Sequence, residues 1–182
     1  LLEQGFKVAV CEQVEDPKTA RGVVKRAITE VITPGVVVDG DHLDARQNNF
    51  LAAVVPQGKR GKRWGIAALD LSTAELRVTE VDEHSVGDEL ARLAPQEIVY
   101  LPTAVDAVTP LRDGIAAAWE EVPSELLLAD KAARALVEEV SGAESEAVGF
   151  DEHPFALRAA CLALRYAERT QPGRGVPSCR VL

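Results

Sequence analysis

The spacing of apolar residues divides the chain into segments of two different periods. Alternation with a period of two is typical of strands, whereas an apolar stripe that recurs every three or four residues is typical of helices. By this criterion, residues 6–11 and 23–33 are predicted strands, and a polar, acidic segment at 36–47 follows them as a linker. The remainder of the chain predicts five more strands, at 50–55, 64–71, 75–81, 97–101 and 118–122.

Three stretches have the helical period. The first begins at Ser85, which we expect to form a capping box with Asp88, three residues later. The second covers residues 124–141, and the third covers 153–170. Apolar residues surround most of the third helix, so we expect it to be covered on most sides.

The order of these elements predicts the fold class. From Asn48 onward, three meander strands come first, and helices then alternate with strands. This order indicates an α/β domain with a mixed sheet flanked by helices. It is the order of a ribonuclease H-like fold.

Charge is distributed unevenly along the 182 residues. The chain has 29 Asp and Glu against 20 Lys and Arg, which gives a net charge of −9. Residues 1–63 hold ten basic and eight acidic residues, and the rest hold ten and twenty-one. A strongly acidic surface repels phosphates, which argues against a free-standing nucleic-acid binder. Any contact with DNA is therefore expected in the first third of the chain.

The remaining composition excludes several classes of protein. Three widely spaced cysteines indicate neither a disulfide framework nor a zinc site, and they fit a reducing cytoplasm. No apolar run approaches the roughly 18 residues that a membrane helix needs, so we expect no contact with a membrane. The chain contains no Met, and we expect it to be a piece of a longer protein.

Motifs for catalysis and cofactors are missing from the sequence. There is no phosphate-binding loop, no G-x-G-x-x-G, no H-E-x-x-H and no C-x-x-C, so we expect no cofactor. Asp70 remains a candidate, because ribonuclease H-type nucleases gather several carboxylates around two metal ions. The predicted strand at 50–55 has no acid, and the one at 97–101 has only Glu97, at its start. We expect Asp70 to hydrogen-bond near a strand end, and a metal-dependent nuclease stays the alternative.

A cluster of basic residues near the start is open to two interpretations. Lys25 and Arg26, with Lys18 and Arg21 before them, are able to contact a phosphate backbone. The same residues are also expected in a solvated face that nearby acids balance. Composition favours the solvated face.

Several motifs together resemble the MutS family of DNA mismatch-repair proteins. They follow the family's order and spacing and cover nearly the whole chain: GFKVAVCEQVEDP at 5–17, VKRAITEVITPG at 24–35, NNFLAAV at 48–54, GIAALDLSTAELRVTE at 65–80, and a late stretch from Gly149 to Gln171 that ends LRAACLALRYAERTQ. A set of motifs in register is far more specific than any one of them.

The resemblance implies a division into three parts. Residues 1–38 correspond to the C-terminal remnant of a mismatch-recognition domain, 39–170 to a ribonuclease H-like connector domain, and 171–182 to the start of a linker to the core domain. In this family the connector has no nuclease activity. The implied function is a non-catalytic connector module that couples mismatch recognition to an ATPase outside this chain. The family's F-x-E mismatch wedge does not occur in the expected place.

The resemblance also implies partners and site residues. In the full-length protein, Arg26, and more weakly Lys25, resemble residues close to the backbone of mismatched duplex DNA. The connector of the family offers a docking surface for MutL and contacts other domains of its own MutS chain. The candidate MutL surface consists of seven acids that we expect around one strand–helix unit, and Glu138 and Glu139 are the pair that tests it. The seven are Glu120, Glu121, Glu125, Glu138, Glu139, Glu144 and Glu146. The alternative for these acids is a helix face kept acidic for solubility.

Overall fold

The structure is a computed structural model of the whole chain. It describes residues 2–4, 6–16, 18, 20, 22–36, 48–58, 62–142, 149–172, 175 and 177–182. The predicted linker at 36–47, apart from Val36, lies outside the described residues, as do Arg21, Glu144 and Glu146.

Two sheets organise the described residues. A two-stranded antiparallel hairpin consists of β1 (Val8–Gln13) and β2 (Arg26–Ile32). A six-stranded sheet has the strand order β7-β6-β3-β4-β5-β8. Its strands are β3 (Leu51–Pro56), β4 (Arg63–Asp70), β5 (Glu75–Asp82), β6 (Glu97–Tyr100), β7 (Ala118–Glu121) and β8 (Arg180–Val181).

The larger sheet is mixed, as the sequence predicts. Strands β3, β4 and β5 form an antiparallel meander, and β6 and β7 continue the sheet in parallel on the other side of β3. An antiparallel meander followed by parallel strands is the topology expected for a ribonuclease H-like order. The predicted α/β class with a sheet flanked by helices is therefore confirmed.

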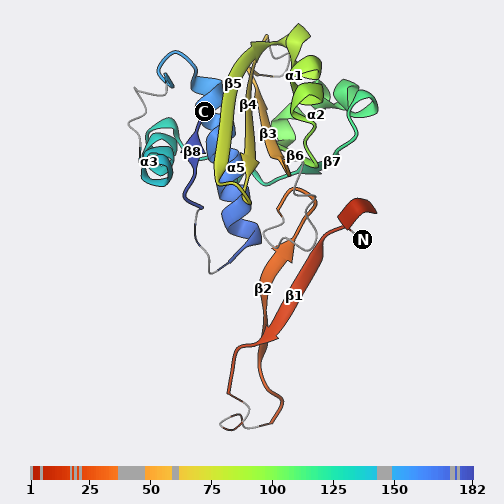
Figure 1. Cartoon of the computed structure of the whole chain (residues 1–182), viewed down its shortest axis with the longest axis vertical. Coiled ribbons are helices and arrows are strands. Elements are labelled where there is room, and N and C mark those ends of the chain that lie inside the picture. The colour runs from red at the N-terminus through yellow and green to blue at the C-terminus, as the bar shows by residue number, and fades with distance from the viewer. Residues whose placement is uncertain are drawn as a thin grey trace.

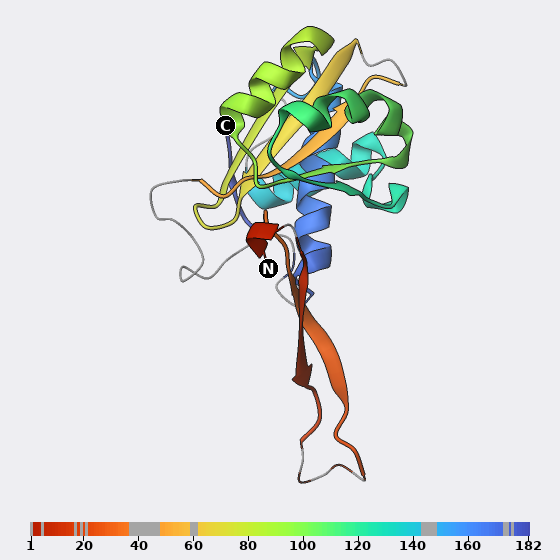
Figure 2. The same cartoon turned by 90° about the vertical axis from the view of Figure 1, so that its right-hand side faces the viewer.

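Helices cover both faces of this sheet. The α-helices are α1 (Val86–Leu93), α2 (Val105–Val108), α3 (Asp130–Ser141) and α5 (Pro154–Thr170). Short 3-10 segments lie at Leu2–Gln4 (η1), Glu83–Ser85 (η3), Pro102–Ala104 (η4), Thr109–Gly114 (η5) and Ser124–Leu126 (η6). Figures 1 and 2 show α1 and α2 on one face of the sheet, and α5 and α3 on the other. No helix among the described residues is long and apolar enough to cross a membrane.

The sheet is buried from both sides, because each face has its own apolar core. On one face, Ile66 and Ile98 pack with Val86 and Leu90 of α1. On the other face, Leu157 and Leu164 of α5 pack in one cluster with Leu51 of β3, Leu69 of β4 and, from α3, Val137. Strands β3 and β4 therefore consist almost entirely of buried residues, which explains their continuous apolar sequence.

Helix α5 is the longest helix in the described residues, and its first turn packs directly on the sheet at Gly65. A Cβ atom at this position of β4 would lie 1.8 Å from the carbonyl oxygen of Phe155, in the first turn of α5. Eleven residues of the helix are buried, as its apolar surroundings predict. Glycine at position 65 thus lets the helix backbone rest directly on the strand.

Three local expectations are wrong. Helix α3 begins at Asp130 rather than at 124, because η6 ends in extended residues at Leu127. The Ser85 side chain makes no capping hydrogen bond to α1. Residues 180–181, for which the sequence predicts no strand, form β8 beside β5.

The hairpin projects away from the mixed sheet (Figures 1 and 2). Its strands pair from Val8–Ile32 near the sheet to Gln13–Arg26 at the far end, with an irregularity between Val10 and Cys11. Phe6, Val14 and Ile28 expose more than half of their surface.

Candidate functional site

Asp70 lies at the end of β4 with none of its surface exposed. Its Oδ1 accepts hydrogen bonds from Ser72 N (2.9 Å), Ser72 Oγ (2.6 Å) and Thr73 N (3.3 Å), and its Oδ2 accepts one from Asn49 N (3.2 Å). The carboxylate therefore holds the β4–β5 turn and the start of β3. This confirms the expectation of a hydrogen-bonded residue at a strand end.

A metal site around Asp70 gains no support. Within the described ranges, no group of three or more His, Cys, Asp or Glu side chains is placed to hold a metal ion. Asp70 already receives hydrogen bonds at both carboxylate oxygens. The two-metal geometry that a ribonuclease H-type nuclease uses needs several converging carboxylates.

Glu97, at the start of β6, is the second buried acid of the sheet, with 1% of its surface exposed. Its Oε2 accepts hydrogen bonds from the Thr33 hydroxyl and from Gly35 N, the latter at 3.0 Å. Its Oε1 accepts a hydrogen bond of 2.6 Å from the Tyr166 hydroxyl, on α5. A buried carboxylate is costly unless it is hydrogen-bonded, and here both oxygens are. One side chain thus connects the end of the hairpin, the sheet and α5.

The T-P-G turn at 33–35 is shaped to reach this carboxylate. Thr33 is fully buried and forms an isolated bridge with Val36, whose N–H donates to Thr33 O at 3.1 Å. A Cβ atom on Gly35 would lie 2.8 Å from Glu97 Cβ and 3.0 Å from Leu51 Cα. Glycine is required there because the turn packs directly against β3 and β6. We name the contact among Thr33, Gly35, Glu97 and Tyr166 the Glu97 joint.

Charged groups surround the joint. Lys7, just before β1, forms an ion pair with Glu120 of β7, and its Nζ lies 5.3 Å from the centre of the Tyr166 ring. Burial lowers the pKa of Lys7, the charge of Glu97 opposes this change, and Arg169 adds to it. Burial raises the pKa of Tyr166, and the charge of Glu97 raises it further. The Tyr166 hydroxyl therefore stays protonated and able to donate to Glu97.

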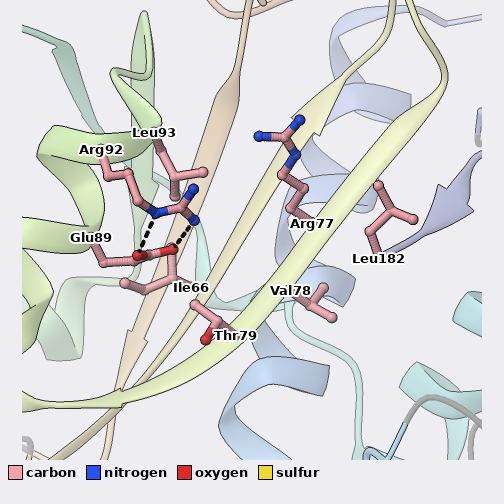
Figure 3. A pocket seen from close by; sticks show the side chains of 8 residues that line it. All are labelled: Ile66, Arg77, Val78, Thr79, Glu89, Arg92, Leu93 and Leu182. Atoms are coloured by element: carbon pink, nitrogen blue, oxygen red, sulfur yellow. Dashed lines mark hydrogen bonds and ion pairs between the residues drawn. The ribbon is translucent and has the colours of Figure 1, made fainter.

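A groove of about 370 Å³ lies on the α1 face of the sheet, beside β5 (Figure 3). Ile66, Val78, Leu93 and Leu182 supply apolar walls, and the polar lining consists of Arg77, Thr79, Glu89 and Arg92. Both guanidinium groups are already paired, Arg92 with Glu89 at 2.6 Å and Arg77 with Glu75 at 2.8 Å. Among the described residues, the groove therefore presents no unpaired charge to a ligand.

Lys25 and Arg26 lie at the far end of the hairpin, where β2 begins, and both are exposed. Lys25 N donates to a carboxylate oxygen of Glu15 at 3.2 Å, and Lys25 O accepts from Val14 N at 3.0 Å. In the described part of the chain, neither basic side chain takes part in a salt bridge. The two charges thus remain available to solvent or to an anionic partner.

Comparison with known proteins now decides the family. The model of MutS domain I matches residues 1–41, and that of MutS domain II matches residues 49–178. The second match alone covers more than half of the chain. This chain belongs to the MutS family of DNA mismatch-repair proteins.

Individual relatives agree with the family models. The chain is 39% identical to the DNA mismatch repair protein MutS of Acaryochloris marina, with 97% of this chain and 21% of that protein covered. It is also 39% identical to MutS of Sorangium cellulosum, with 100% and 20% covered. The chain therefore spans about a fifth of the length of these MutS relatives.

One solved structure has a similar arrangement of elements. It is RuvC of T. thermophilus in complex with a Holliday junction substrate, which matches with a TM-score of 0.49 and 15% identity. The match covers 71% of this chain and 99% of that one. A likeness of this extent carries no information about the function of the MutS chain.

The acids proposed for a MutL surface do not share one strand–helix unit. Glu120 lies on β7 and pairs with Lys7, whereas Glu138 and Glu139 lie on α3, which packs against α5. Figure 1 shows β7 and α3 on opposite sides of the molecule. Glu139 is exposed and Glu138 is half-buried. The acidic stretch of sequence is thus split in space, because the chain crosses from the sheet edge to the α5 side.

Sequence reasoning missed the Glu97 joint. From its residue type Glu97 is a candidate metal ligand, and Thr33 and Tyr166 belong only to family motifs. The available signal was an acid directly before the apolar run Ile98–Tyr100, because such an acid is buried with its strand and needs partners. The identity of those partners depends on contacts between residues 62 to 69 positions apart.

Proposed function

We propose that this chain is the non-catalytic connector module of a MutS protein, together with the end of its mismatch-recognition domain. In the full-length protein it would couple mismatch recognition to the ATPase and offer a docking surface for MutL. The observation that carries the proposal is the Glu97 joint. It fastens the segment matched by MutS domain I to the segment matched by MutS domain II through buried hydrogen bonds. Coupling requires a defined contact of this kind between two parts of a molecule.

We also propose that the exposed Lys25 and Arg26 give the hairpin weak binding to DNA. We expect the isolated chain to bind matched and mismatched duplexes equally and weakly, because the chain is acidic overall and few phosphate contacts remain. Reversing both residues to Glu should remove most of the low-salt binding and reduce the slope of log K against log salt by up to about 2. Fluorescence anisotropy with labelled duplexes at several salt concentrations measures this.

The matched control for DNA binding reverses Lys62 and Lys131, which are exposed and lie away from the hairpin. This control changes the net charge by the same amount but leaves both basic residues of the hairpin in place. It should therefore weaken binding far less than reversal of Lys25 and Arg26. Equal effects of the two double reversals would show that only net charge matters. A mismatch preference above about tenfold would contradict the domain assignment.

Docking of MutL is proposed for the α3 side of the connector. Reversal of Glu138 and Glu139 to Lys should weaken binding of MutL at low salt, because opposite charge steers association over a range that salt screens. Isothermal titration of the chain with MutL at two salt concentrations measures the change. Reversal of Asp106 and Asp113, both exposed on other elements, is the matched control. If the two reversals have the same effect, the docking surface lies elsewhere.

A further inference from the structure

We propose that Glu97 is a positioning residue that transmits movement of the β1–β2 hairpin to helix α5. Its two carboxylate oxygens have separate partners. Oε2 holds the hairpin through Thr33 and Gly35, and Oε1 holds α5 through Tyr166. Because the carboxylate is a rigid planar group, a displacement of one set of donors changes the geometry of the other.

Burial makes this connection stiff. With Glu97 only 1% exposed and Thr33 fully buried, water is not available to replace a broken hydrogen bond. Loss of the Tyr166 hydroxyl would leave Oε1 without a donor, and loss of the Thr33 hydroxyl would leave Oε2 with Gly35 N alone. Either loss at a buried carboxylate costs more than loss of an exposed hydrogen bond. Movement of the turn at 33–35 is therefore more favourable when Glu97 and Tyr166 move with it.

Glu97 is connected to the sheet through its backbone and to α5 through its side chain. Glu97 is paired with Leu51 of β3 on one side and with Ala118 of β7 on the other. Tyr166 lies near the C-terminal end of the 17-residue α5, whose first turn rests on Gly65 of β4. A shift at Tyr166 thus acts on a helix that spans the face of the domain.

A second contact between hairpin and sheet differs in character. The side chains of Lys7 and Glu120 are 33% and 30% exposed, so their ion pair is screened by salt. The hydrogen bonds of the Glu97 joint are buried and should respond little to salt. Ionic strength therefore separates the two connections experimentally.

The inference rests on the proposed coupling role, but its test needs neither DNA nor MutL. The experiment is amide hydrogen exchange, followed by NMR, on the 182-residue chain and on Thr33→Val. This variant keeps the shape of the side chain and removes one donor to Glu97. We expect amide exchange at the last turn of α5, residues 166–170, to become roughly tenfold faster or more. An increase of this size is what the loss of one hydrogen bond to a charged group should cause. The increase should persist at high salt.

Thr29→Val is the matched control, because Thr29 lies on β2, four residues before Thr33, and its hydroxyl donates to Val10 O within the hairpin, at 3.4 Å. It should leave exchange in α5 unchanged. Tyr166→Phe is the reciprocal variant and should speed exchange at Val31 and Ile32 of β2. The Lys7 contact with the ring remains in that variant. If Thr33→Val does not fold, Tyr166→Phe alone decides.

Two outcomes would overturn the proposal. One is a change confined to the hairpin in Thr33→Val, or to α5 in Tyr166→Phe. The other is an additive effect in the Thr33→Val, Tyr166→Phe double variant, because residues that act through one carboxylate should not contribute independently. Failure of DNA or MutL binding would refute the proposed function and would leave these exchange results unaffected.

Discussion

Asp70 and Glu97 are both buried acids at strand ends, yet their hydrogen bonds have different ranges. Asp70 accepts from residues of its own turn and from Asn49, whereas Glu97 connects residues of three distant segments. The donors Ser72 and Thr73 follow Asp70 within three residues in the sequence LDLST, so the role of Asp70 could be predicted. The role of Glu97 was not, because its donors come together only when the hairpin and α5 meet.

Replacement of Asp70 tests its structural role. Asp70→Ala should lower the free energy of unfolding by about 2–4 kcal/mol, because the backbone N–H groups of Ser72, Thr73 and Asn49 lose a charged acceptor. Urea unfolding followed by circular dichroism measures this. Asp113→Ala, at an exposed position in η5, should change it by less than about 0.5 kcal/mol. Cleavage of DNA or of an RNA–DNA hybrid with Mg²⁺ or Mn²⁺, lost in Asp70→Asn, would revive the nuclease alternative.

Strands and helices with a long, clear period were predictable, and short or irregular ones were not. The strands of the meander and α5 agree with their predicted ranges to within one or two residues. Strand β8 has two residues, too few to show alternation, and it exists because β5 offers an edge to pair with. The predicted start of α3 is too early because Leu126 and Leu127 continue the apolar pattern of the helix. In the structure Leu126 is the last residue of η6, and Leu127 is extended. Tertiary packing, rather than local preference, determines such boundaries.

Packing of α5 on β4 leaves no room for a side chain at position 65. Gly65→Ala should lower the free energy of unfolding by roughly 3 kcal/mol or more, because its Cβ would occupy the position of the Phe155 carbonyl. Gly87→Ala is the matched control, since a Cβ at that position of α1 meets nothing within 4 Å. It should raise stability by about 0.5–1 kcal/mol through the helix preference of Ala. Equal small effects of the two substitutions would mean that α5 adjusts its position easily.

At the scale of the molecule, the Glu97 joint is a buried connection between the hairpin and the mixed sheet. We expect residues 36–182 alone to fold cooperatively, because Val36 begins the apolar core and the sheet lacks no strand. Their free energy of unfolding should fall by about 1–3 kcal/mol, because Glu97 loses the donors Thr33 and Gly35. Thermal and urea unfolding measure this. A chain that starts at Thr33 restores those donors and should regain most of the loss. Absence of a cooperative transition in both would show that the hairpin is part of the folding unit.

The hairpin also has the dimensions of a lever with its pivot at Thr33. Seven residues of β2, at roughly 3.3 Å each, place Arg26 on the order of 20 Å from Ile32. A rotation of about 10° at the pivot would then move the end with Lys25 and Arg26 by roughly 4 Å, while the turn at 33–35 moves by a fraction of that distance. A displacement of the basic end therefore produces a smaller displacement at the Glu97 carboxylate, and the force there is correspondingly larger. A pivot transmits sub-ångström displacements only if its atoms are closely packed. The close contact of Gly35 with β3 and β6 provides this packing.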